Sequence, residues 1–293
     1  MSVEALKAPA FITPAWMIRL RGWTAGHPTA AAGLALVVFW ILVALAAPIL
    51  PLRPPHRTYT PLLPPMTIGP DGGLFLLGAD HMGRDLLSRT IWGARRVLIY
   101  APVAVGSAYV IGGLGGAMAG YLRGWVDEAL SRLADLIMSL PALPLFVVAV
   151  SMFGASPASI LGCIVVAKSP RVLRLVRGLV IEAREAGYVQ AARMRGESSL
   201  YIVLVEILPN VKGPLLVDAC VSLGYVIVAI GALGFLGLGL PPPDANWGTM
   251  IAQGREVLIV APHVVLVPCV ALLSFVVGCN LLADGLKPRT AAR

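Results

Sequence analysis

Long apolar runs alternate with short polar segments along the chain, and the lengths of these runs predict its architecture. A transmembrane helix needs about 20 predominantly apolar residues to cross the hydrocarbon core of a bilayer. The runs that approach this length cover residues 29–50, 97–122, 134–153, 158–175, 215–235 and 261–282. The pattern therefore predicts an all-α integral membrane protein with six transmembrane helices.

The polar segments between these runs divide the chain into parts. No small-residue cleavage site follows the first apolar run, so residues 1–28 are expected to form a retained cytoplasmic arm. Residues 51–96 are rich in Pro and Gly and are predicted to be extracytoplasmic. The parts that follow are a five-helix core at 97–286, which includes a charged cytoplasmic loop at 176–213 and an outer loop at 236–258, and a cytoplasmic tail at 287–293.

Composition narrows the class of protein. Of 293 residues, 58% are hydrophobic and only 13% are charged, and the mean hydropathy is +0.83. These values exclude a soluble globular domain. The net charge of +8 does not indicate nucleic-acid binding, because the basic residues lie beside apolar runs and no basic stripe alternates with aromatic residues. The four cysteines lie within apolar stretches without metal-ligand spacing, and we interpret them as packing residues.

The basic residues also predict the orientation in the membrane. Lys and Arg number 16 in the segments expected inside and 7 in those expected outside. This bias follows the positive-inside rule and places the charged loop and both termini in the cytoplasm, with the helices in the membrane lipid. Lys168, near the inner end of the fourth run, either lines a pathway or extends its ammonium to the interface.

The charged loop at 176–213 has the pattern of two short helices that meet at a corner. We expect acidic residues, Glu182 and Glu185, near the start of the first helix and basic residues near its end, as the helix dipole favours. Gly196 can close that helix in the left-handed conformation. We call this loop the knob, because two short helices at an angle form a compact protrusion that a separate soluble protein can grip.

The second helix of the knob is predicted at residues 200–207. Ser198 or Ser199 can cap its start, since their hydroxyls accept hydrogen bonds from free backbone N–H groups. Pro209 ends it, because proline cannot continue a helix.

The knob also carries a motif. Gln190-Ala191-Ala192 is followed after three residues by Gly196, and nine more residues lead to Glu206-Ile207-Leu208-Pro209-Asn210. In spacing and in its closing Leu-Pro-Asn, the motif resembles the EAA loop of importer-type ABC permeases, which docks into a cleft of the ATPase subunit. Gln190 stands where the family has Glu, and Glu206 where it often has Ile or His. We therefore expect a hydrogen bond where the family forms an ion pair with its ATPase.

Two further stretches resemble the dipeptide, oligopeptide and nickel branch of these permeases. One is residues 236–247; the other precedes the second apolar run and matches at Asp80, Gly83, Arg84, Asp85, Ser88, Arg89, Gly93 and Arg95. From residue 19 to residue 289 the chain is similar to the second permease subunit of that branch. The resemblance implies a type I ABC importer permease fold with cytoplasmic EAA coupling helices. The coupling residues that it implies are Glu185, Tyr188, Gln190, Ala191, Ala192, Gly196, Leu208, Pro209 and Asn210.

The resemblance also implies partners. These are a homologous permease that completes a heterodimer, two cytoplasmic ATPase subunits and an extracytoplasmic solute-binding protein. The residues themselves exclude ATP hydrolysis by this chain, because none of its lysines follows a glycine as in a P-loop. We expect a non-catalytic subunit without cofactor or metal of its own, with ATP and Mg²⁺ bound by the ATPases.

The solute is less sharply predicted. Trp247 and Met250 on the outer loop are candidates for contact with the binding protein or the solute. Di- or oligopeptides are favoured, because His81 and Asp85 without further His or Cys make a poor transition-metal site. Nickel, glutathione and D,D-dipeptides remain alternatives within the family.

Two other classes of function remain open. A secondary carrier would need an ionisable residue near mid-membrane, and the predicted helices place none there. A membrane anchor without transport of its own is the second alternative.

Overall fold

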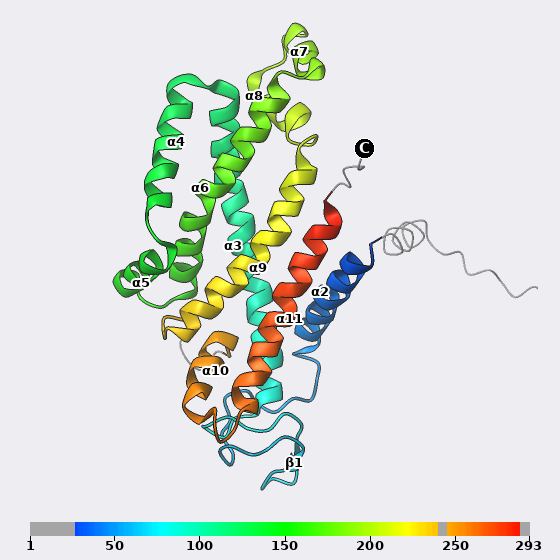
Figure 1. Ribbon diagram of the computed structural model, residues 1–293, viewed down its shortest axis with the longest axis vertical. Helices are drawn as coiled ribbons and strands as arrows, with labels where there is room; N and C mark the ends of the chain where they lie inside the picture. Colours follow the sequence, from blue (N-terminus) through cyan, green and yellow to red (C-terminus); the bar gives the residue numbers. More distant parts are fainter. Residues whose placement is uncertain (1–26, 240–244, 288–293) are drawn as a thin grey trace, which may run out of the picture.

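The computed structural model describes residues 27–239 and 245–287, which form a mainly helical molecule drawn out along one axis (Figure 1). Most of the predicted cytoplasmic arm and of the predicted tail lies outside these residues. In chain order the helices are α2 (Pro28–Ala46), α3 (Leu86–Leu122), α4 (Gly124–Ser139), α5 (Ala142–Phe153), α6 (Pro157–Arg184), α7 (Gly187–Met194), α8 (Ser199–Tyr201), the π-helix η1 (Ile202–Ile207), α9 (Lys212–Phe235), α10 (Trp247–Gly254), the 3₁₀-helix η2 (Arg255–Val257) and α11 (His263–Leu286).

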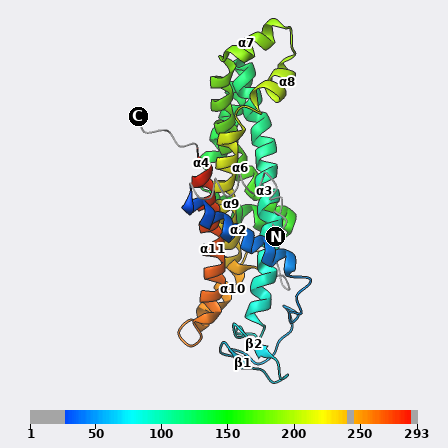
Figure 2. The same ribbon diagram turned by 90° about the vertical axis from the view of Figure 1, so that its right-hand side faces the viewer.

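The two ends of the long axis differ. Figure 2 shows α7 and α8, the helices of the knob, at one end and the strands β1 (Thr67–Ile68) and β2 (Leu74–Phe75) at the other. The strands pair in antiparallel register, with Thr67 opposite Phe75. We call residues 51–85 together with α10 the outer cap, because they close the end of the bundle opposite the knob.

Four of the described helices have the length and apolar composition of membrane spans: α2, α3, α9 and α11. A fifth span is formed if α4 and α5 are taken together, although they are bent by 88° at the break between them. The predicted fourth span lies in α6, which is 28 residues long but carries Lys168 and several arginines. The structure thus supports a multi-span helical membrane protein with four or five spans by length and composition.

The third predicted span, residues 134–153, is not one helix. The chain leaves helical geometry at Leu140, which is extended with φ −84° and ψ 128°, and α5 begins after Pro141. The residue before a proline is driven out of the helical region by the proline ring, and proline itself offers no N–H to continue the hydrogen bonds. The apolar composition of the run concealed this break.

Helix α3 begins earlier than the predicted start at residue 97. The Asp85 side chain accepts a hydrogen bond from the Ser88 N–H at 2.8 Å and so caps the helix at its start. The 37 residues of α3 extend roughly 55 Å, more than the hydrocarbon thickness of about 30 Å. The end of the predicted extracytoplasmic segment therefore belongs to this helix.

Small residues let α3 and α6 approach closely, as expected for glycine-rich membrane helices. A Cβ atom at Gly116 would lie only 2.4 Å from the carbonyl oxygen of Leu173 on α6. One turn before, a Cβ at Gly112 would lie 2.3 Å from the Ser169 carbonyl oxygen, and one turn after, a Cβ at Gly120 would lie 2.8 Å from the Arg177 carbonyl oxygen. Gly106 and Gly113 of α3, by contrast, face open space. The glycines of this helix thus divide into a packed stripe and an unpacked set.

Candidate functional site

The first helix of the knob, α7, is shorter than predicted. Glu182 lies in the last turn of α6, and Glu185 is the residue at which α6 ends. The acidic residues therefore precede α7 and do not form its first turn. The prediction that Glu182 and Glu185 begin the first knob helix is wrong, because α6 continues from the bundle into the knob and includes this stretch.

The corner after α7 has the predicted geometry. Gly196 has φ +78°, in the left-handed region. Its N–H donates to the Arg193 carbonyl at 2.9 Å, and the Glu197 N–H donates to the Ala192 carbonyl at 3.2 Å. This pair of hydrogen bonds is the Schellman closure of a helix. The backbone chemistry of a few consecutive residues therefore fixes the corner.

The second knob helix starts at the predicted cap but is not a regular α-helix. The Ser198 hydroxyl accepts from the Tyr201 N–H at 3.3 Å. From Ile202 onward the segment is π-helical, and the Leu208 N–H donates to the Val203 carbonyl at 2.9 Å. Asn210 closes the turn, since its side-chain amide donates to the Glu206 carbonyl at 2.6 Å. π-helical turns are rare and occur frequently at functional sites.

An apolar core fastens the knob to the bundle. Val189, Ala192, Ile202 and Ile207 are buried and cluster with valines of α6. Among the predicted coupling residues, Ala192 thus points inward and supports the knob from behind. The predicted residues that remain exposed are Glu185, Tyr188, Gln190, Gly196, Pro209 and Asn210, whereas Ala191 and Leu208 are half-buried.

The polar groups of the knob are largely engaged within the chain. Arg195 donates to Glu206 at 2.9 Å, and the Gln190 amide donates to the Glu185 carbonyl at 3.2 Å. The exposed apolar side chains Met194 and Leu200 have 84% and 68% of their surface accessible. The knob thus presents apolar and small residues on a corner that is held by its own hydrogen bonds.

The outer cap contains a buried ionic network whose role the sequence did not predict. Asp80 pairs with Arg84 at 2.7 Å and lies 3.6 Å from Arg89. Arg84 also donates to Gln253 of α10 at 3.0 Å, and Arg89 donates to the Pro55 carbonyl at 3.2 Å. The two arginines are 8% and 2% exposed. Acidic and basic residues so close in a Gly-rich turn were a signal for the pairs with Asp80, but Gln253 and Pro55, the other acceptors of the two arginines, lie far away in the sequence.

Asp85, considered above together with His81 as a metal ligand, has a structural role at the start of α3. The Asp85 carboxylate caps α3, and burial raises its pKa, against the lowering effects of the Ser88 hydrogen bond and the Arg53 charge. Within 27–239 and 245–287, no group of three or more His, Cys, Asp or Glu side chains is arranged to hold a metal ion.

Trp247 and Met250 are buried, at 0% and 3% exposure. The Trp247 indole N–H donates to the Thr90 carbonyl at 3.0 Å, and its ring packs against Trp40 with centroids 5.0 Å apart. The expectation that these side chains face a solute or a docked protein does not agree with this placement. Trp247 joins the outer cap to α2 and α3.

A polar cluster lies at the level of the membrane helices: Tyr109 of α3, Lys168 of α6, and Asp218 and Ser222 of α9. The Tyr109 hydroxyl donates to the Asp218 carboxylate. The Ser222 hydroxyl donates to the same carboxylate at 3.5 Å, and Asp218 attracts the Lys168 ammonium electrostatically. The sequence did not connect these side chains, because they belong to three different helices.

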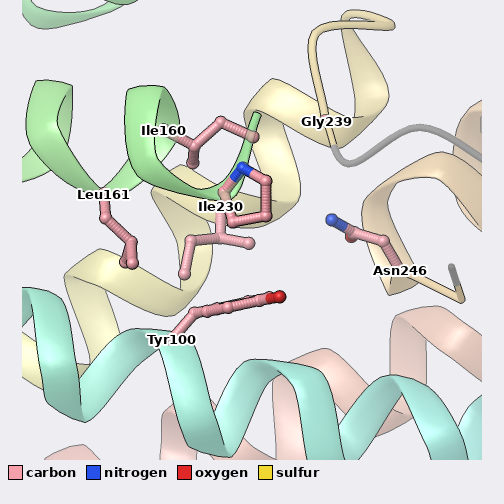
Figure 3. A pocket seen from close by; sticks show the side chains of 7 residues that line it. Tyr100, Ile160, Leu161, Ile230, Gly239 and Asn246 are labelled. Atoms are coloured by element: carbon pink, nitrogen blue, oxygen red, sulfur yellow. The ribbon is translucent and has the colours of Figure 1, made fainter. Parts of the chain in front are cut away.

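The bundle contains a small cavity between α3, α6 and α9. Its volume is about 10 Å³, and Figure 3 shows Tyr100 and Asn246 pointing into it from different elements. Such a space is close to the minimum that holds a single water molecule. This cavity is too small for a solute.

Comparison with known proteins defines the class further. Residues 112–291 match the family described as the binding-protein-dependent transport system inner membrane component. The dipeptide transport system permease protein DppC of Alkalihalophilus pseudofirmus is 34% identical over 87% of this chain and 83% of its own length. The di/tripeptide permease protein DppC of Pseudomonas aeruginosa is 35% identical over 95% of this chain and 93% of its own. The glutathione transport system permease protein GsiD of Pectobacterium atrosepticum is 33% identical over 72% and 70%.

The fold defines a multi-pass helical membrane protein. The chain belongs to the family of binding-protein-dependent transport system inner membrane components.

Proposed function

We propose that the chain is a permease subunit of an ATP-binding cassette importer and forms a translocation pathway together with a homologous permease. The observation that carries the proposal is the knob, an exposed corner of two short helices in a member of this family. Separate ATPase subunits would bind it and supply the energy. A solute-binding protein would deliver the solute at the outer cap.

The small cavity supports a pathway shared between two chains. The cavity of about 10 Å³ between α3, α6 and α9 does not admit a peptide, and we infer that the solute passes along a face of this chain. A second permease on that face would complete the passage. This arrangement supports the heterodimer that the family resemblance implies. The six-span fold predicted from the apolar runs remains part of the proposal, with α6, which holds the predicted fourth span, as the additional span.

The proposed coupling mechanism follows from the mechanics of the knob. When the ATPase pair closes on ATP, the knob moves with the cleft that holds it, and its apolar core transmits the movement to α6. The bundle then tips between inward-facing and outward-facing states. Tyr188, Gln190, Ala191, Gly196 and Pro209 would contact the ATPase, while Ala192 packs behind them.

Peptides are the proposed solutes. Two of the relatives named above are dipeptide or di/tripeptide permeases by name. The GsiD relative keeps glutathione as a second candidate, and nickel and D,D-dipeptides are the remaining family alternatives. The proposed location is a prokaryotic inner membrane with both termini and the knob in the cytoplasm.

The test begins with gentle purification of the chain from its native membrane and identification of the stoichiometric companions. We expect a second permease and P-loop ATPases. The purified complex, placed in proteoliposomes with its binding protein, should take up a labelled dipeptide only with ATP. Parallel assays use glutathione, a D,D-dipeptide and a nickel chelate.

The outcomes separate the classes of function. Uptake that survives ATP depletion but not an uncoupler would contradict the importer and favour a secondary carrier. Uptake that is unchanged when this chain is deleted would favour a membrane anchor. ATP-driven uptake of glutathione but not of dipeptides would retain the importer and change its solute.

A further inference from the structure

Lys168 of the polar cluster has an ammonium group that its own chain does not saturate. Its Nζ atom lies 5.8 Å from the centre of the Tyr225 ring of α9. No hydrogen-bond acceptor of the described residues pairs with it, although an ammonium offers three donors. Lys168 lies within α6, which holds the predicted fourth span, and ionisable residues within membrane helices are candidates for solute pathways by default. Lys168 is therefore available to an anionic group from outside the chain.

The Asp218 carboxylate, unlike the Lys168 ammonium, has hydrogen-bond partners among the described residues. It already accepts hydrogen bonds from the hydroxyls of Tyr109 and Ser222. Its remaining influence on Lys168 is electrostatic attraction. In this cluster the Lys168 ammonium can therefore bind an anion, whereas the Asp218 carboxylate already has its hydrogen-bond donors.

An apolar hollow begins one turn away on α9. Tyr225 has 61% of its surface exposed, and Val228, three residues on, is 45% exposed. Val228 lines a hollow of about 360 Å³ whose other walls include Leu143 of α5, Phe235 of α9 and Leu272 of α11. Solute sites are typically apolar with a few placed polar groups, and one positive group beside an apolar hollow has this composition.

We propose that this face is the part of the translocation pathway that holds a peptide in transit. Lys168 binds the terminal carboxylate, the Tyr225 ring lies along the peptide backbone, and the hollow from Val228 to Leu272 receives an apolar side chain. The site rests on the proposed function and adds to it a substrate class: peptides with a free carboxylate and at least one apolar side chain.

Photo-crosslinking tests the placement. The whole importer carries p-benzoylphenylalanine in place of Tyr225 and, as a matched control, in place of Phe39, which is 53% exposed on α2. During ATP turnover with tritiated alanyl-phenylalanine, we expect a covalent dipeptide adduct at position 225 and none at position 39. Adducts at position 225 that contain only lipid or the partner permease, in the same yield with and without dipeptide, would overturn the proposal.

Substitution of the cation tests its chemistry. Lys168→Met is expected to lower alanyl-phenylalanine uptake about tenfold, because the paired carboxylate loses a charge-assisted hydrogen bond. Lys168→Arg should keep most of the uptake, and both variants should co-purify with the ATPases in wild-type amounts. Equal uptake by the Met variant and the wild type would reject the proposed peptide site at Lys168 but leave the proposed importer function intact. A wild-type complex that takes up no dipeptide rejects the proposed function itself.

Discussion

The two ends of the molecule are held by different kinds of interaction. The outer cap is fixed by buried ions and a buried indole whose partners lie far away in the sequence, as in the bond from Arg84 to Gln253. The knob is fixed by hydrogen bonds among neighbours, such as the closure at Gly196, and by a small apolar core. The outer end is therefore held together by contacts within this chain. The knob end presents an exposed surface whose shape is preset, as docking to a partner requires.

The largest loss of stability is expected when the buried ionic network of the outer cap is broken. Asp80→Ala removes the anion that pairs with Arg84 and Arg89, leaving buried positive charge uncompensated. Losing one member of a buried ion pair costs about 3–5 kcal/mol. The thermal unfolding midpoint of the detergent-purified chain, followed by tryptophan fluorescence, should fall sharply. Glu128→Ala is the matched control, because the Glu128 side chain is 70% exposed and such pairs contribute at most about 1 kcal/mol. Similar midpoints for the two variants would show that the network does not hold the cap.

The second-largest loss of stability is expected where α3 packs against α6, in the helical bundle that connects the two ends. Gly116→Val places a side chain against the backbone of α6, since even a Cβ would lie 2.4 Å from the Leu173 carbonyl oxygen. Such overpacking costs about 1–3 kcal/mol or more. Gly113→Val, on the open side of the same helix, should leave thermal stability close to wild type. The reverse order of stability would mean that α3 and α6 pack through another face.

A smaller effect on stability is expected at the corner of the knob. Gly196→Val places a β-branched residue at φ +78°, which costs roughly 1–2 kcal/mol. If the corner transmits the movement of the ATPases, the number of solute molecules taken up per ATP hydrolysed should fall while the chain still inserts into the membrane. Gly178→Val, where an added side chain meets open space on α6, is the control. If the Gly196 variant takes up as many solute molecules per ATP as the wild type, the corner does not transmit the movement of the ATPases.

The smallest effect is expected at the exposed ion pair of the knob. Glu206→Gln removes the charge that pairs with Arg195, whose side chain is 53% exposed, so the stability change should be under about 1 kcal/mol. Because this carboxylate is engaged within the chain, the amount of ATPase that co-purifies should change little. Loss of the ATPase on this substitution would show that Glu206 contacts the partner directly.

Local backbone chemistry explains what the sequence predicted well. The closure at Gly196 and the cap at Ser198 depend on adjacent residues. The early start of α3 and the break before Pro141 were also encoded locally, by Asp85 and by the proline. They were missed because hydropathy averaged over a long window does not register single capping or helix-breaking residues.

By itself, the sequence determined that this is a multi-pass helical membrane protein of the binding-protein-dependent transport family with a protruding knob, because hydropathy, spacing and turn residues are properties of contiguous stretches. Only the tertiary structure decided that Trp247 is buried, that Arg84 donates to Gln253, and that Tyr109 donates to Asp218. The physical reason is that these contacts join segments far apart in the chain. Which face of each helix meets its neighbour depends on packing, and no local pattern specifies it.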